Sequence, residues 1–143
     1  MQFPPQWEIT AGNPDGKGKN TTGNDPVIKL TTETFKKKVF NYDLNKEWKY
    51  EGNTPAIIDF YADWCAPCRQ LSPIVEEIAK EYSGKIVVYK INTDEEKTLA
   101  MNMGISSLPT LIFIPANGKP QYTVGVIPKS TLVKALNEIL LTK

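Results

Sequence analysis

Two cysteines lie three positions apart in the segment Trp64-Cys65-Ala66-Pro67-Cys68, and the chain contains no other cysteine. The sequence also has no histidine, which excludes Ser-His and Cys-His catalysis and any His-ligated metal. A structural zinc site usually takes four Cys or His ligands, and a disulfide framework spreads its cysteines to close long loops. Neither pattern is present, so we predict no metal site. The chemistry left to the pair is a dithiol that opens and closes.

The position of the pair favours a reactive thiol. The apolar run 56–61 predicts a buried strand, and apolar residues spaced by three and four predict a helix from about Cys65 to Gly84. Cys65 then falls at the helix start, where free N–H groups and the helix dipole favour a thiolate. Pro67 suits the first turn. We expect Cys65 to attack a partner's disulfide and Cys68, as the more buried sulfur, to resolve the mixed disulfide.

The composition is that of one globular domain. The chain has 143 residues, of which 41% are hydrophobic and 23% charged, and its net charge is +1. Because positive and negative charges are nearly equal in number, the sequence predicts neither nucleic acid nor an anionic membrane surface as a partner. No apolar run is long enough to span a bilayer.

The first 26 residues differ from the rest. Residues 1–10 lack a basic region followed by an apolar stretch, so no signal peptide is visible. In residues 11–26 only Ala11 is apolar, which predicts a flexible arm over 1–26 ahead of a folded domain over 27–143. The pattern Asn20-Thr21-Thr22 matches a glycosylation acceptor, which we attribute to chance in a Gly/Asn-rich stretch.

The remaining elements follow from patterns of apolar and capping residues. Strands are predicted over 26–30, 86–91, 110–114 and 122–126, the last two joined as a hairpin through Asn117-Gly118. Helices are predicted after Thr31 or Thr32, after a capping box of Thr93 and Glu96, and after Pro128. The βαβ unit gives parallel strands and the hairpin antiparallel ones. We therefore expect an α/β fold with a central mixed sheet and helices on both faces.

Three segments together resemble the thioredoxin family. Residues 59–69 (DFYADWCAPCR) resemble its active-site block, residues 106–110 (SSLPT) its loop with a cis proline, and residues 124–126 (VGV) its groove glycine. The resemblance runs from about Val27 to the C-terminus. It implies the thioredoxin fold and exchange of disulfides with protein substrates. It also implies no cofactor beyond the Cys65–Cys68 pair, and an unidentified reductase that recharges it.

The resemblance also assigns roles to single residues. Pro109 would be the cis proline beside the cysteines, and the backbone of Leu108 would pair with an extended substrate segment. The substrate surface would further include Gly125 and the exposed side of Trp64, Ala66 and Pro67.

Asp59 and Lys90 are charged residues inside otherwise apolar strands. The resemblance makes Asp59 the group that exchanges a proton with Cys68, through water, with Lys90 as its neighbour. The alternative is that both residues lie at strand ends and reach solvent.

The sequence departs from the family pattern in two places. Ala66 replaces the common glycine, and the dipeptide lacks the histidine of strongly oxidising relatives, which favours a reductant. The aromatic segment 40–54 is longer than the usual connection, and it either caps the sheet edge or recognises a partner. With the polar arm it resembles exported bacterial thioredoxin-like proteins, so we expect a periplasmic rather than a cytoplasmic location.

Three functions remain open from the sequence. The first is a general protein-disulfide reductase, and the second is an oxidant or isomerase in an oxidising compartment. The third is a binding module that uses the fold as a clamp and needs neither cysteine. One groove and no exposed apolar stripe predict a monomer.

Overall fold

A computed structural model describes residues 25–142. Residues 1–24 lie outside the described part, so the flexible arm over 1–26 and the domain boundary at 27 stay predictions. Within the described part, no helix has the length and apolar character needed to cross a bilayer.

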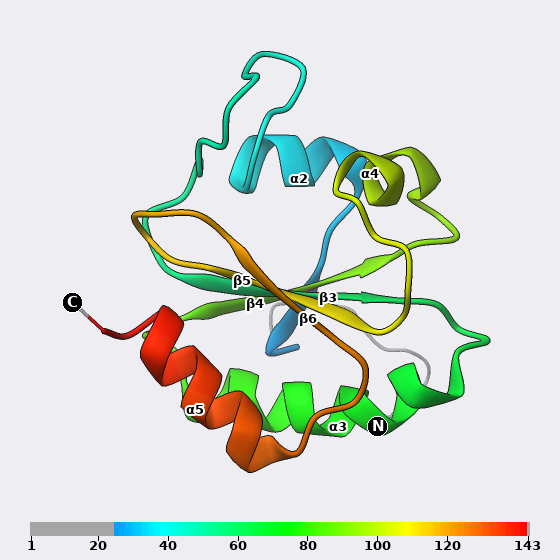
Figure 1. Cartoon of the computed structure of the whole chain (residues 1–143), viewed down its shortest axis with the longest axis vertical. Coiled ribbons are helices and arrows are strands. Elements are labelled where there is room, and N and C mark those ends of the chain that lie inside the picture. Colours follow the sequence, from blue (N-terminus) through cyan, green and yellow to red (C-terminus); the bar gives the residue numbers. More distant parts are fainter. Residues whose placement is uncertain (1–24, 143) are drawn as a thin grey trace.

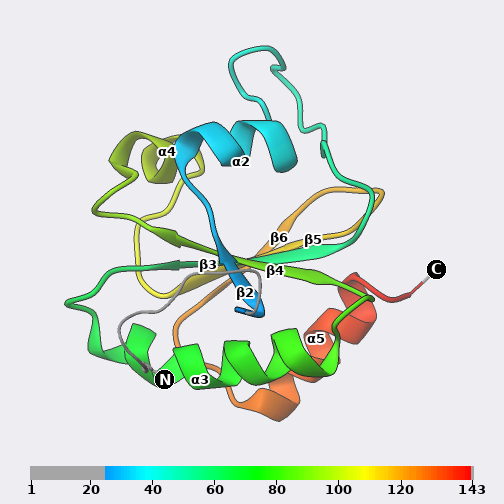
Figure 2. The ribbon, with the colours of Figure 1, turned by 180° about the vertical axis from the view of Figure 1, so that it is seen from behind.

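A five-stranded mixed sheet forms the centre of the molecule. Its order is β2-β4-β3-β5-β6. Strands β2, β4 and β3 are parallel to one another, β5 is antiparallel to β3, and β6 is antiparallel to β5. The strands are β2 (Val27–Lys29), β3 (Ala56–Tyr61), β4 (Val87–Asn92), β5 (Thr110–Ile114) and β6 (Gln121–Val124). The helices are α2 (Thr32–Lys38), α3 (Ala66–Glu81), α4 (Lys97–Asn102) and α5 (Lys129–Ile139). Figures 1 and 2 show α3 and α5 on one face of the sheet and α2 and α4 on the other, which confirms the predicted architecture.

Each face of the sheet carries its own core, because successive side chains of a strand point to opposite faces. Along β3, Ile57 belongs to the cluster under α3 and α5, whereas Ile58 and Phe60 belong to the cluster under α2 and α4. Asp59 therefore points to the α3/α5 face. On β4, Val88 lies on that same face, and so does Lys90 two residues later.

The predicted capping box of Thr93 and Glu96 is wrong. Glu96 is the N-cap residue of α4 but makes no cap hydrogen bond. Its Oε1 instead accepts hydrogen bonds from the N–H and Oγ1–H of Thr32, at 2.9 and 2.7 Å. The turn before α4 is held by Asn92, whose Oδ1 accepts from the N–H groups of Asp94 and Glu95. The Glu96 carboxylate thus joins α4 to α2.

The aromatic segment 40–54 packs onto the core rather than along a sheet edge. Phe40 is buried, and its ring centroid lies 4.8 Å from that of Trp48. Tyr42, Trp48 and Tyr50 all pack against the cluster under α2 and α4. Figure 1 shows the segment as a loop that projects beyond α2. Its aromatic side chains extend the core on this face, and recognition of a partner by this segment stays a prediction.

Candidate active site

The cysteine pair lies at the junction between β3 and α3, and the structure holds it as a disulfide with 5.3 Å between the Cα atoms. Cys65 is the N-cap residue of α3, and its Sγ accepts a hydrogen bond from the N–H of Cys68 at 3.2 Å. A helix start presents unpaired N–H groups and the positive end of the dipole. Both effects favour a negative charge on the Cys65 sulfur, as the sequence predicted.

Exposure does not separate the two cysteines in this disulfide form. Cys65 is 4% exposed and Cys68 is 3% exposed. Tyr61 and Leu108 pack against the cluster that contains both cysteines, so the expected greater burial of Cys68 stays a prediction. What separates the cysteines is their place in the helix. Cys65 caps it and accepts the N–H, whereas Cys68 lies within its first turn.

The loop before β5 lies against the disulfide. The Leu108–Pro109 peptide is cis, and Leu108 packs against the cysteines. Gly125 has φ of 91°, and its N–H donates to the carbonyl of Pro109 at 2.8 Å. This positive φ ends β6 at Val124, two residues earlier than predicted. The structure thus brings Leu108, Pro109 and Gly125 together beside the cysteine pair.

Trp64 provides an exposed apolar surface next to Cys65. Its side chain is 69% exposed, and its Nε1 donates to Oδ2 of Asp94 at 2.8 Å. Ala66 and Pro67 are exposed beside it. Sequence reasoning missed Asp94, although a signal existed. Because β3 and β4 are parallel, the loops that follow them meet at one edge of the sheet.

Asp59 is buried in the middle of the sheet, with 5% exposure. It pairs in register with Lys90 on one side and Leu111 on the other, so the alternative of a strand-end position is wrong for this residue. Its Oδ1 makes no hydrogen bond to any of residues 25–142. Burial raises the pKa of Asp59 to about 7, and the nearby Lys90 opposes this rise. Asp59 can therefore gain and lose a proton near neutral pH.

Lys90 is half-buried and shares the α3/α5 face with Asp59. Among the described residues it makes no ion pair within 4.0 Å. Its ammonium group therefore acts on Asp59 through space rather than through a direct contact.

Residues 25–142 contain no cluster of three or more His, Cys, Asp or Glu side chains that could hold a metal.

Comparison with known proteins agrees with this geometry. The family model for thioredoxin matches residues 26–138. The chain is 46% identical to thioredoxin from Borreliella burgdorferi over 112 residues, which cover 78% of this chain and 96% of that protein. It is 42% identical to thioredoxin from Pyropia yezoensis over 114 residues, covering 80% and 97% of the two chains. The structure of chloroplastic thioredoxin z is similar, with a TM-score of 0.67, 29% identity, and coverage of 79% of this chain and 93% of that one.

The chain therefore belongs to the thioredoxin family. It has the thioredoxin fold, and it is a thiol–disulfide oxidoreductase that reduces disulfides of protein substrates through the Cys65–Cys68 pair. The two cysteines carry the electrons themselves, so the reaction uses no cofactor. No finding favours the oxidant, isomerase or non-catalytic clamp.

Proposed function

We propose that this reductase works with Cys65 as the attacking sulfur and Cys68 as the resolving sulfur. The observation that carries the assignment is the hydrogen bond from the Cys68 N–H to the Cys65 Sγ at the start of α3. The Cys65 thiolate attacks a substrate disulfide, forms a mixed disulfide and expels one substrate sulfur as a thiolate, which takes a proton from water. Cys68 then attacks the Cys65 sulfur, which closes the Cys65–Cys68 disulfide and releases the second substrate thiol. Two electrons pass to the substrate.

Asp59 is the proposed proton acceptor for Cys68 in the second step. A thiol must lose its proton to become a nucleophile, and a carboxyl group that titrates near pH 7 is suited to take it. Lys90, the register partner of Asp59, favours the ionised carboxylate that can accept the proton.

The substrate segment is proposed to lie across Trp64, Ala66 and Pro67 on one side and Leu108, Pro109 and Gly125 on the other. The exposed indole supplies an apolar platform, and the backbone of Leu108 is proposed to pair with an extended chain. Main-chain pairing accepts many sequences, in keeping with a reductase that acts on several proteins.

Trapping of the covalent intermediate tests the two cysteine roles. In Cys68→Ser, the mixed disulfide between Cys65 and a substrate such as insulin has no resolving thiol and should accumulate on a non-reducing gel. The matched variant Cys65→Ser should accumulate none. Accumulation on Cys65→Ser instead would reverse the assignment, and trapping on neither variant would remove it.

The partners and compartment are also proposals. A dedicated reductase must return two electrons per cycle, and NADPH-coupled insulin reduction with candidate reductases tests which one does so.

The protein is expected to be a monomer, and light scattering after gel filtration measures its mass in solution. The polar N-terminal sequence and the long segment 40–54 favour a periplasmic location, which cell fractionation with an antibody against the protein tests.

A further inference from the structure

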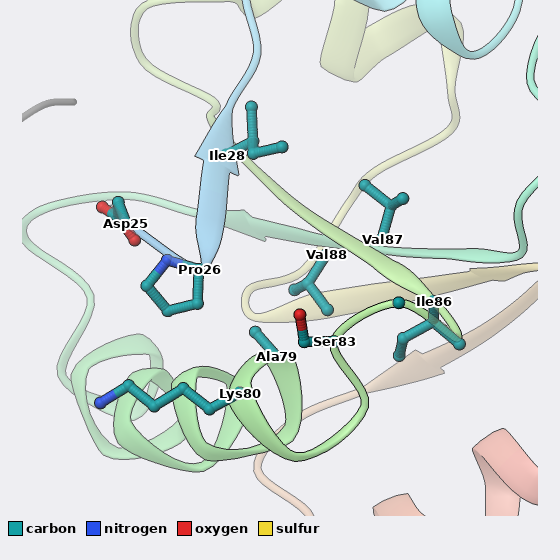
Figure 3. A pocket seen from close by; sticks show the side chains of 10 residues that line it. Asp25, Pro26, Ile28, Ala79, Lys80, Ser83, Ile86, Val87 and Val88 are labelled. Carbon is teal, nitrogen blue, oxygen red and sulfur yellow. The ribbon is translucent and has the colours of Figure 1, made fainter. Parts of the chain in front are cut away.

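A hollow of about 410 Å³ lies between the C-terminal end of α3, the beginning of β4 and the chain entering β2 (Figure 3). It lies at the opposite end of α3 from the disulfide and is not part of the site above. Ala79 of α3 and Val88 of β4 both line this hollow. These two residues mark the level at which the helix faces the strand.

From that level, the geometry of the βαβ unit places a second carboxyl group over Lys90. The helix α3 runs antiparallel to β4, because it connects the parallel strands β3 and β4. Three residues back along α3, a rise of about 4.5 Å, lies Glu76. Two residues forward along β4, about 6.6 Å, lies Lys90 on the same face as Val88. Glu76 and Lys90 therefore face each other, and both are half-buried.

The charges around Glu76 agree with this placement. Burial raises the pKa of Glu76, and among its charged neighbours Lys90 has the largest effect, ahead of Asp25 and Lys80. Within residues 25–142, Glu76 forms no ion pair shorter than 4.0 Å. Lys90 is thus the main cation available to it.

The register partners of Lys90 and Asp59 on the flanking strands β2 and β5 do not compete for this position. From β2, Lys29 is the register partner of Lys90, but its ammonium pairs with Glu95 at 2.8 Å. On the side of β5, Asp59 faces the uncharged Leu111.

We propose that Glu76 is a positioning residue that shares Lys90 with Asp59. Glu76 draws the Lys90 ammonium toward α3 and thereby determines the pH at which Asp59 loses its proton. Two carboxyl groups and one ammonium cannot all be paired at once. When Glu76 is ionised, Lys90 stabilises the Asp59 carboxylate less, and the proton stays on Asp59 to a higher pH. The inference rests on the proposed role of Asp59 for its functional meaning, but not for its test.

The test is the variant Glu76→Gln, which keeps the shape of the side chain and removes its charge. The titration of the Asp59 carboxyl is followed by ¹³C NMR of the oxidised protein, with Asp59→Asn to assign the signal. The pKa of Asp59 should fall by about half a unit or more, because Lys90 is released to it. Glu77→Gln is the matched control. Glu77 is exposed and pairs with Lys129 at 3.4 Å, so its loss should leave the Asp59 titration unchanged.

A double-mutant cycle separates positioning from a general change in structure. In a Lys90→Met background, Glu76→Gln should no longer change the pKa of Asp59. In the wild-type background, Glu76→Asp should leave the pKa of Asp59 close to that of the unaltered protein. Equal Asp59 titrations in Glu76→Gln and Glu77→Gln would overturn the proposal, and so would an undiminished effect without Lys90. These measurements need no turnover. A failure of insulin reduction by the unaltered protein would therefore count against the proposed function and not against this inference.

Discussion

The layer between the sheet and helices α3 and α5 contains the charged residues Asp59 and Lys90 among apolar side chains, whereas the cluster under α2 and α4 consists of uncharged apolar and aromatic residues. Both layers are closely packed, and each contains fully buried phenylalanine or leucine side chains. The difference lies in what each layer must hold in place. Burial of a carboxyl group in the layer under α3 lowers the free energy of unfolding, and apolar burial in the opposite layer offsets this loss.

The largest effect is expected from opening a cavity in the apolar layer. Phe35 of α2 is fully buried, so Phe35→Ala should lower the free energy of unfolding by about 3–5 kcal/mol. Urea unfolding measures the loss. Insulin reduction below the melting temperature should stay close to that of the unaltered protein, because Phe35 lies on the face away from the cysteines. A loss of turnover with an intact fold would show that the two layers do not act separately.

A change of opposite sign is expected in the charged layer. The pKa of Asp59 rises from 3.8 in the unfolded chain to about 7 in the folded one. As pH rises from about 4 to 7, the unfolded state loses this proton first, so the folded state loses stability, by ~4 kcal/mol at most. Asp59→Asn should therefore unfold like the unaltered protein near pH 4 and be more stable than it above pH 7. Equal stabilities at pH 8 would contradict the interior titration of Asp59.

The same variant should slow catalysis. Without a carboxyl group to take the Cys68 proton, insulin reduction by Asp59→Asn should fall by about tenfold or more near pH 7. The deficit should shrink toward pH 9, where the thiol ionises without help. A pH–rate profile that matches the unaltered protein would remove Asp59 from the mechanism.

A smaller effect is expected at the rim of the site. Asp94→Asn weakens the acceptor for the Trp64 indole, and an exposed hydrogen bond of this kind contributes about 1 kcal/mol or less. The rate of insulin reduction should fall by about twofold, and the fluorescence anisotropy of Trp64 should decrease as its ring gains freedom. Asp43→Asn, which removes the charge that pairs with Lys36 on the other face, serves as the control.

The smallest effect is expected where the apolar layer contains a polar atom without a partner. Trp48 Nε1 is buried and makes no hydrogen bond to any of residues 25–142. Trp48→Phe removes this donor and keeps an aromatic ring against Phe40, so the free energy of unfolding should change by less than about 1 kcal/mol. Trp48→Ala, which also removes the ring, should cost about 3 kcal/mol or more.

The elements with strong local signals could be predicted from the sequence. Strands β3 and β5 begin and end at the predicted residues, since each is a continuous apolar run. The sequence left open whether Asp59 lies inside the sheet or at a strand end, because its partners Lys90 and Leu111 belong to other strands. The link made by Glu96 could not be predicted. Its carboxylate binds Thr32, which is 64 residues away, and no local pattern reports such a partner. The nearly equal burial of Cys65 and Cys68 was missed for the same reason, because Leu108, from the loop before β5, packs against them from a distant segment.

The exposed indole beside Cys65 also has a consequence for observing this protein. Disulfides quench the emission of a neighbouring tryptophan, so light emitted by Trp64 should brighten when the pair opens. Trp48, held among aromatic rings on the opposite face, should keep a constant intensity. The emission of Trp64 thus reports the redox state of the cysteine pair without an attached dye, and Trp48 serves as a reference within residues 25–142.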